Sequence, residues 1–81
     1  MVDRNEVINL YEAKKASTLQ VVSIPNIGLL ENLGLYVGTE IVIQNRYRFG
    51  GPVLLRVRDA YQVAIGKDIA KQVTVKEVST S

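Results

Sequence analysis

The fold is decided by residues 39–58, TEIVIQNRYRFGGPVLLRVR, in which two alternating segments flank a turn. In the first segment Ile41 and Ile43 share one face, and in the second Val53 and Leu55 do the same. Apolar side chains at every second position are typical of strands that bury one face. The letters FGGP between the segments are turn-forming residues. This stretch therefore predicts a long antiparallel hairpin.

Outward from the hairpin, three more β-branched segments predict the remaining strands, at 18–24, 61–65 and 72–78. A short helix is predicted over 27–33, with Asn26 as its cap and Gly34 as the residue that ends it. Short strands in a small sheet leave two open edges, and curling into a barrel removes most of that edge. We therefore predict an all-β fold, a five-stranded SH3-like barrel with one short helix after the first strand.

The length of 81 residues is enough for one domain. We predict a flexible leader over 1–9, the barrel domain over 10–78 and a frayed tail over 79–81, because both ends are polar. A helical turn is expected at the start of the domain, with Leu10 and Ala13 facing inward.

Cysteine and histidine are both absent from the sequence. Their absence excludes thiol nucleophiles, imidazole bases, disulfides and Cys/His metal sites. The eight carboxylates are scattered, with no pair spaced to share an ion. We therefore expect no catalytic, cofactor or metal site, and no enzyme. No segment is apolar enough to span a membrane or to serve as a signal peptide, so we expect a cytoplasmic protein without membrane insertion.

Positive charge is concentrated in the second half of the chain, although the net charge is only +2. Residues 1–44 hold three basic and five acidic residues, whereas residues 45–71 hold six basic and two acidic residues. Strict alternation places four arginines on the outward face of the hairpin. The register predicted for the two strands sets Arg46 opposite Arg56, and like charges in that position are unfavourable.

Three interpretations of this basic hairpin remain open. In the first, the arginine stems cover apolar surface while Glu40 or Asp59 offsets their charge. In the second, the hairpin docks an acidic protein partner, because arginine beside aromatic residues is typical of interfaces. The third is nucleic-acid binding, which four tyrosines and one phenylalanine support poorly because base stacking needs several aromatics. The residues predicted to bind a protein partner are Arg46, Tyr47, Arg48, Arg56 and Arg58, with Leu29 and Leu33 of the predicted helix next.

Three motifs follow one another along the chain: LENLGLYVGT at 30–39, GPV at 51–53 and VAIGKDIAKQVTV at 63–75. In this order and spacing they resemble the FeoA domain family, whose members carry an L-x-x-L-G-[LI]-x-x-G segment, a hairpin turn and a similar closing segment. The resemblance runs from about residue 10 to residue 77. It departs from the family pattern at Ala16, where many members have glycine.

The resemblance implies the same SH3-like barrel that the strand pattern predicts. It also implies a non-enzymatic accessory protein of bacterial ferrous iron uptake. Such a protein binds the cytoplasmic, GTPase-containing part of the FeoB-type iron transporter, which is the expected partner, with no nucleic acid and no cofactor involved. The alternative is a stand-alone regulatory or nucleic-acid-binding SH3-like barrel. The sequence leaves the oligomeric state open.

Overall fold

The computed structural model describes residues 6–47 and 49–78 of the chain. In chain order its elements are β1 (Val7–Asn9), the 3₁₀ turn η1 (Leu10–Glu12), β2 (Thr18–Ser23), α1 (Gly28–Asn32), β3 (Glu40–Arg46), β4 (Val53–Val57), β5 (Tyr61–Ile65), α2 (Lys67–Ala70) and β6 (Thr74–Glu77). The predicted tail at 79–81, the first five residues of the predicted leader and Arg48 lie outside the described residues.

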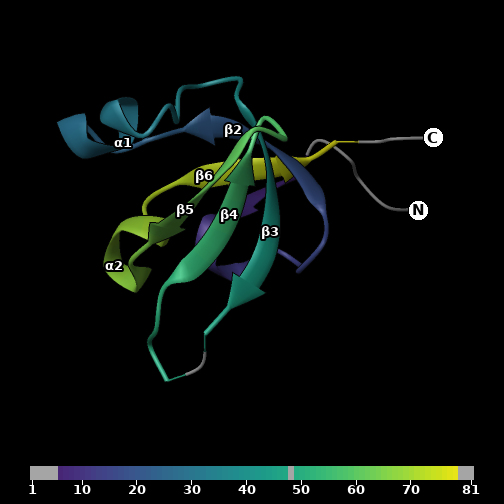
Figure 1. Cartoon of the computed structure of the whole chain (residues 1–81). Helices are drawn as coiled ribbons and strands as arrows, with labels where there is room; N and C mark the ends of the chain where they lie inside the picture. Colours follow the sequence, from purple (N-terminus) through teal and green to yellow (C-terminus); the bar gives the residue numbers. More distant parts are fainter. Residues whose placement is uncertain (1–5, 48, 79–81) are drawn as a thin grey trace.

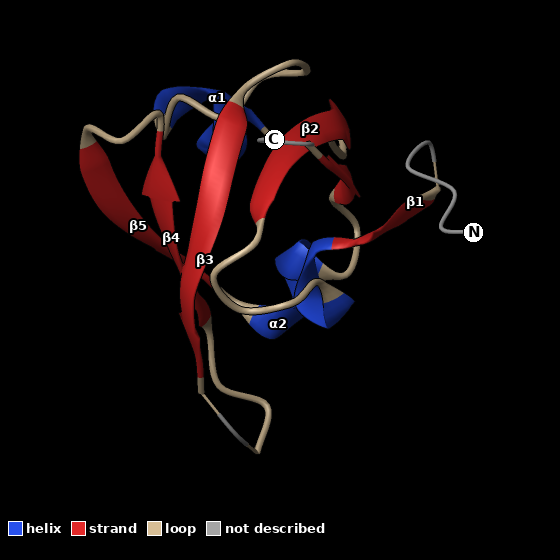
Figure 2. Cartoon of the chain, turned by 90° about the vertical axis from the view of Figure 1, so that its right-hand side faces the viewer, coloured by secondary structure: helices blue, strands red, loops and turns tan. Residues whose placement is uncertain are grey.

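The strands form one antiparallel sheet in the order β1-β6-β2-β3-β4-β5. Figures 1 and 2 show this sheet strongly twisted and curled, with α1 and α2 at opposite ends of the strands. The predicted all-β, SH3-like fold is confirmed, with six strands in the described part of the chain rather than five. Most of the strand ends agree with the sequence prediction to within two residues.

The sixth strand, β1, falls in the segment predicted as a flexible leader. Val7 lies opposite Lys76 and Ile8 opposite Val75, so β1 extends the sheet beyond β6. The leader prediction is therefore wrong for Val7–Asn9. A three-residue strand shows almost no alternation in the sequence, and its pairing partner lies more than sixty residues away, so only the folded chain identifies it.

The core is a single cluster of buried apolar side chains drawn from every element except β1. The apolar inward positions predicted for the hairpin are buried, as are Leu10 and Ala13 before the first long strand. Asn45 and Tyr47, which strict alternation places on the same face, are not buried. Val75 of β6 and Val73 just before it close the cluster. This burial fixes which face of each strand is turned to solvent, and hence where the charged side chains can gather.

The hairpin register differs from the predicted one. Arg56 lies opposite Val42, and Arg46 lies opposite Val53, so the predicted pairing of Arg46 with Arg56 is wrong. The register shifts by one residue at Gln44, which marks a β-bulge. Because the bulge adds one residue, side chains after it point to the face opposite to the one that strict alternation predicts. Arg46 therefore shares the face of buried Val53.

The helix α1 ends as predicted, but it begins differently. Gly34 has a φ of +83°, and the Leu35 amide donates to the Leu30 carbonyl at 2.9 Å, which is the expected geometry of a glycine helix end. The predicted cap by Asn26 is wrong, because Ile27 occupies the N-cap position and no side chain caps the helix. This helix thus depends on burial of Leu30 more than on capping.

Candidate functional site

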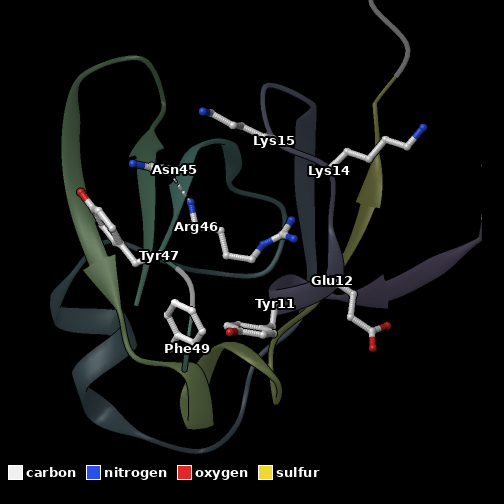
Figure 3. A pocket seen from close by; sticks show the side chains of 8 residues that line it. All are labelled: Tyr11, Glu12, Lys14, Lys15, Asn45, Arg46, Tyr47 and Phe49. Atoms are coloured by element: carbon white, nitrogen blue, oxygen red, sulfur yellow. Dashed lines mark hydrogen bonds between the residues drawn. The ribbon is translucent and has the colours of Figure 1, made fainter. Parts of the chain in front are cut away.

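A groove of about 850 Å³ opens between the η1–β2 segment and the end of the β3–β4 hairpin, and we call it the basic groove. Its lining residues are Tyr11, Glu12, Lys14, Lys15, Asn45, Arg46, Tyr47 and Phe49. Figure 3 shows Arg46 extending across the groove toward the segment that carries Lys14. The lining holds three cations and one carboxylate, and three of its eight residues are aromatic.

Arg46 connects the two walls of the basic groove. One of its terminal guanidinium nitrogens, Nη2, donates to the backbone carbonyl of Ala13, while its Nε is buried with no hydrogen-bond partner among the described residues. The bulge at Gln44 makes this contact possible, because it turns Arg46 away from the outward face. Arg46 is thus a positioning residue that also leaves a positive charge in the groove.

Two lysines of α2 and the turn after it extend the positive charge. The Lys67 Nζ lies 5.6 Å and the Lys71 Nζ 5.9 Å from the centre of the Tyr11 ring. Ammonium groups at this distance over an aromatic face are attracted by its quadrupole. Asp68 lies between these lysines in the sequence, and it is exposed. The ring of Tyr11 therefore lies where the charges of α2 and of the basic groove meet.

Two aromatic side chains are exposed on the hairpin side of the groove. Tyr47 is half exposed, and Phe49 is fully exposed at the hairpin tip. Phe49 also has a φ of +61°, in the left-handed region that a residue other than glycine seldom adopts. Next to it, Gly50 has a φ of +81°. The turn thus holds a large apolar side chain out in solvent at the groove rim.

The other predicted arginines lie on a different surface. Arg56 and Arg58 line a second groove of about 530 Å³, together with Glu40 and Asp59. The Arg56 Nε is 3.0 Å from the Asp59 carboxylate, so the predicted neutralisation by Asp59 is confirmed for Arg56. Because the hairpin register separates these arginines from Arg46, the predicted contact residues do not form one surface.

The two predicted leucines occupy a third location, on and beside α1. Leu29 is half exposed, whereas Leu33 is partly buried against the core. Tyr36 and Val37, which follow the helix, are also exposed. Only Arg46 and Tyr47, of the predicted set, line the basic groove. Arg48 lies outside the described residues.

Three residues of this site were not predicted from the sequence: Tyr11, Lys14 and Lys15. The adjacent lysines were visible as a charged pair, but alternation placed the hairpin arginines on the opposite face. The bulge at Gln44 brings Arg46 to the lysines. Glycine marks some bulges in a sequence, but no glycine occurs at this one. A single sequence does not contain the information that residues 13 and 46 lie in contact.

No group of three or more carboxylate, histidine or cysteine side chains is arranged to hold a metal ion in residues 6–47 and 49–78. Within the same ranges, no helix has the length and apolar character needed to cross a membrane.

Comparisons with known proteins agree on one family. The family model described as the FeoA domain matches residues 8–77. Among solved structures, an iron uptake regulatory protein (FeoA) is 30% identical with a TM-score of 0.80, covering 90% of this chain and 99% of its own. A FeoA-like protein from Clostridium acetobutylicum is 28% identical with a TM-score of 0.78, covering 95% of this chain and 93% of its own.

A manganese-dependent transcriptional repressor shares the fold at a TM-score of 0.81 and 17% identity; the match covers 95% of this chain and 45% of the repressor. The search of curated proteins found no match. The family model spans most of the chain, and the two FeoA structures match it over nearly their whole length. The chain belongs to the FeoA domain family.

Proposed function

We propose that this chain is a non-enzymatic accessory protein of bacterial ferrous iron uptake. It acts in the cytoplasm by binding the GTPase-containing cytoplasmic part of a FeoB-type iron transporter. Ferrous iron is the cargo of the transporter in this proposal, and the chain carries no resident cofactor.

The observation that carries the proposal is the FeoA family match over residues 8–77. It is supported by the similarity to a solved iron uptake regulatory protein, which the chain covers almost completely. The sequence itself has no cysteine and no histidine, so it lacks the side chains best suited to bind ferrous iron or to perform acid–base chemistry. These observations favour a role in contacting the transporter over a role in handling the ion.

The proposed contact residues fall on three surfaces. Arg46 and Tyr47 line the basic groove, Arg56 and Arg58 line the second groove, and Leu29 and Leu33 belong to the α1 region. A partner of ordinary interface size buries about 800 Å² on each side.

The test is a titration of isotope-labelled full chain with the cytoplasmic domain of the transporter, loaded in turn with GDP and with a non-hydrolysable GTP analogue. We expect saturable amide shifts, with a dissociation constant in the micromolar range typical of transient partners. No shift at about 0.1 mM partner with either nucleotide would overturn the proposal. Tighter binding to a single-stranded RNA, lost steeply between 50 and 200 mM salt, would favour the nucleic-acid-binding alternative.

A further inference from the structure

We infer that the basic groove binds an acidic segment of the partner protein, and that this segment carries a large apolar side chain among its carboxylates. The inference rests on the proposed function only in assigning the segment to the transporter. The chemistry of the segment is argued from the groove itself.

Charge is the first argument. Three cations line the groove, Lys14, Lys15 and Arg46, and two more, Lys67 and Lys71, lie near the ring of Tyr11 in its wall. The carboxylates on the same elements are Glu12, Asp68 and Glu40, all exposed, and Glu40, at the far end of β3 from Arg46, lines the second groove. In residues 6–47 and 49–78, the ion pair found within 4 Å joins Arg56 and Asp59, on the other groove. The positive charge of the basic groove is therefore not neutralised within the described chain, and it attracts acidic partners.

Rigidity is the second argument. The Ala16 amide donates to the Ile43 carbonyl at 2.8 Å, and the Ser17 amide donates to the Lys14 carbonyl at 3.3 Å. Arg46 holds the carbonyl of Ala13 on the other side. The turn that carries the two lysines is thus fixed to β3 at both of its ends. A preorganised turn loses little conformational entropy when it binds a partner.

The exposed aromatics are the third argument, and they specify the apolar part of the segment. Phe49 is fully exposed, and Tyr47 is half exposed on the same side of the groove. Holding Phe49 at a positive φ is unfavourable for a residue with a Cβ, and such strained positions cluster at binding sites. An apolar side chain in the groove removes these rings from water, while flanking carboxylates reach the lysines.

A protein segment fits these features better than a nucleic acid. The net charge of the chain is only +2, which is low for a protein that binds the phosphate backbone of a nucleic acid. Arginine, tyrosine and phenylalanine together are the composition of protein interfaces. The groove therefore selects carboxylates that are spaced around an apolar anchor.

The experiment compares two charge-matched variants of the full chain. Lys14→Glu with Lys15→Glu reverses two exposed lysines of the basic groove, and Arg56→Glu with Arg58→Glu reverses two cations of the second groove. Both variants change the net charge equally. We expect the first to weaken binding to the transporter's cytoplasmic domain by about tenfold or more, and the second, which removes proposed contacts of the second groove, by less than the first. Phe49→Ala, at a fully exposed position, should weaken it by about three- to tenfold.

A second probe tests the chemistry without the transporter. It is a peptide with two glutamates on either side of a leucine, compared with its counterpart that has serine in place of leucine. We expect the leucine peptide to shift the amides of Lys14, Lys15 and Phe49 more strongly than the serine peptide.

The outcomes separate the two proposals. If the native chain does not bind the cytoplasmic domain but the leucine peptide shifts the groove amides, the proposed function fails and the inferred chemistry stands. If the native chain binds the domain and the Lys14/Lys15 variant binds it equally well, the inference is overturned and the proposed function stands. A larger loss from the Arg56/Arg58 variant, or preferential groove binding of single-stranded RNA, also overturns the inference.

Discussion

Among the residues that the structure describes, four other than glycine have a positive φ, and two of them lie in the walls of the basic groove or beside them. Phe49 forms the rim, and Ala16, with a φ of +70°, closes the turn that carries Lys14 and Lys15. A positive φ at the third residue of a four-residue turn is the geometry of a type II turn, which favours glycine. The departure from the family pattern at Ala16 thus falls on a residue whose backbone conformation is strained.

Replacing Ala16 with glycine should stabilise the chain. Alanine is strained at a φ of +70°, and glycine removes the Cβ that causes the strain. The expected gain is about 0.5–1 kcal/mol in the free energy of unfolding, measured by urea denaturation. Ala60→Gly is the control, since Ala60 is equally exposed and lacks a positive φ. It should instead lose up to about 1 kcal/mol, and equal effects at both positions would contradict the turn geometry.

Replacing Gly34 with alanine should destabilise the chain by more than about 1 kcal/mol. Its φ is +83°, and an added Cβ would collide with the Tyr61 hydroxyl, which donates to the Leu33 carbonyl at 2.7 Å. Gly28→Ala is the matched control, because a Cβ there meets nothing and the φ is not positive. Denaturation should show the control unchanged or slightly stabilised.

The two causes of destabilisation by Gly34→Ala, backbone strain and collision with Tyr61, can be separated. In a Tyr61→Phe background the hydroxyl is gone, so Gly34→Ala should destabilise less than it does in the native chain, leaving only the backbone strain. An identical loss in both backgrounds would show that the collision with Tyr61 is relieved without a free-energy change.

At the scale of the elements, the end of helix α1 was predictable from the sequence, whereas the strand register was not. The helix end at Gly34 was predictable because it depends on neighbouring residues. The bulge in β3 was not, because it depends on how the core accepts Ile43 and Val53 from two strands at once. The bulge determines which residues form the site, because it turns Arg46 from the outward face toward the Ala13 carbonyl.

Two asparagines test the capping assignments. The Asn9 side chain accepts from the Glu12 amide at 3.1 Å and caps η1, whereas Asn26, which the sequence favoured as a cap, makes no cap hydrogen bond to α1. We expect Asn9→Ala to destabilise by about 0.5–2 kcal/mol and Asn26→Ala by less than about 0.5 kcal/mol. Thermal denaturation of both variants measures the difference. A larger loss from Asn26→Ala would reverse the two assignments.

At the scale of the whole molecule, the one apolar cluster joins both ends of the curled sheet. Val75 of β6, near one end of the sheet, and Ile65 of β5, at the other end, are both buried in it. A small domain with a single core usually unfolds in one cooperative transition. The groove therefore does not form independently of the sheet, because both of its walls are attached to this core.

Substitutions of two neighbouring leucines of β4 measure how much burial in that core contributes to the free energy of unfolding. Leu55 is fully buried, while Leu54 is half buried on the opposite face. Leu55→Ala should destabilise by about 2–5 kcal/mol, and Leu54→Ala by less than half of the Leu55 value. Urea denaturation followed by far-UV circular dichroism should show one transition for each variant. Similar losses at the two positions would mean that strand β4 is buried on both faces.

The sequence by itself determined the hairpin, the inward faces of its two strands up to the bulge, the helix end and the absence of thiol and imidazole chemistry. Each of these depends on residue type or on local spacing, which a single sequence carries. The tertiary structure alone decided the pairing of β1 with β6, the bulge at Gln44 and the position of Arg46 beside the lysines. These features arise because distant segments share one small core, and packing them together selects a register that local alternation does not contain.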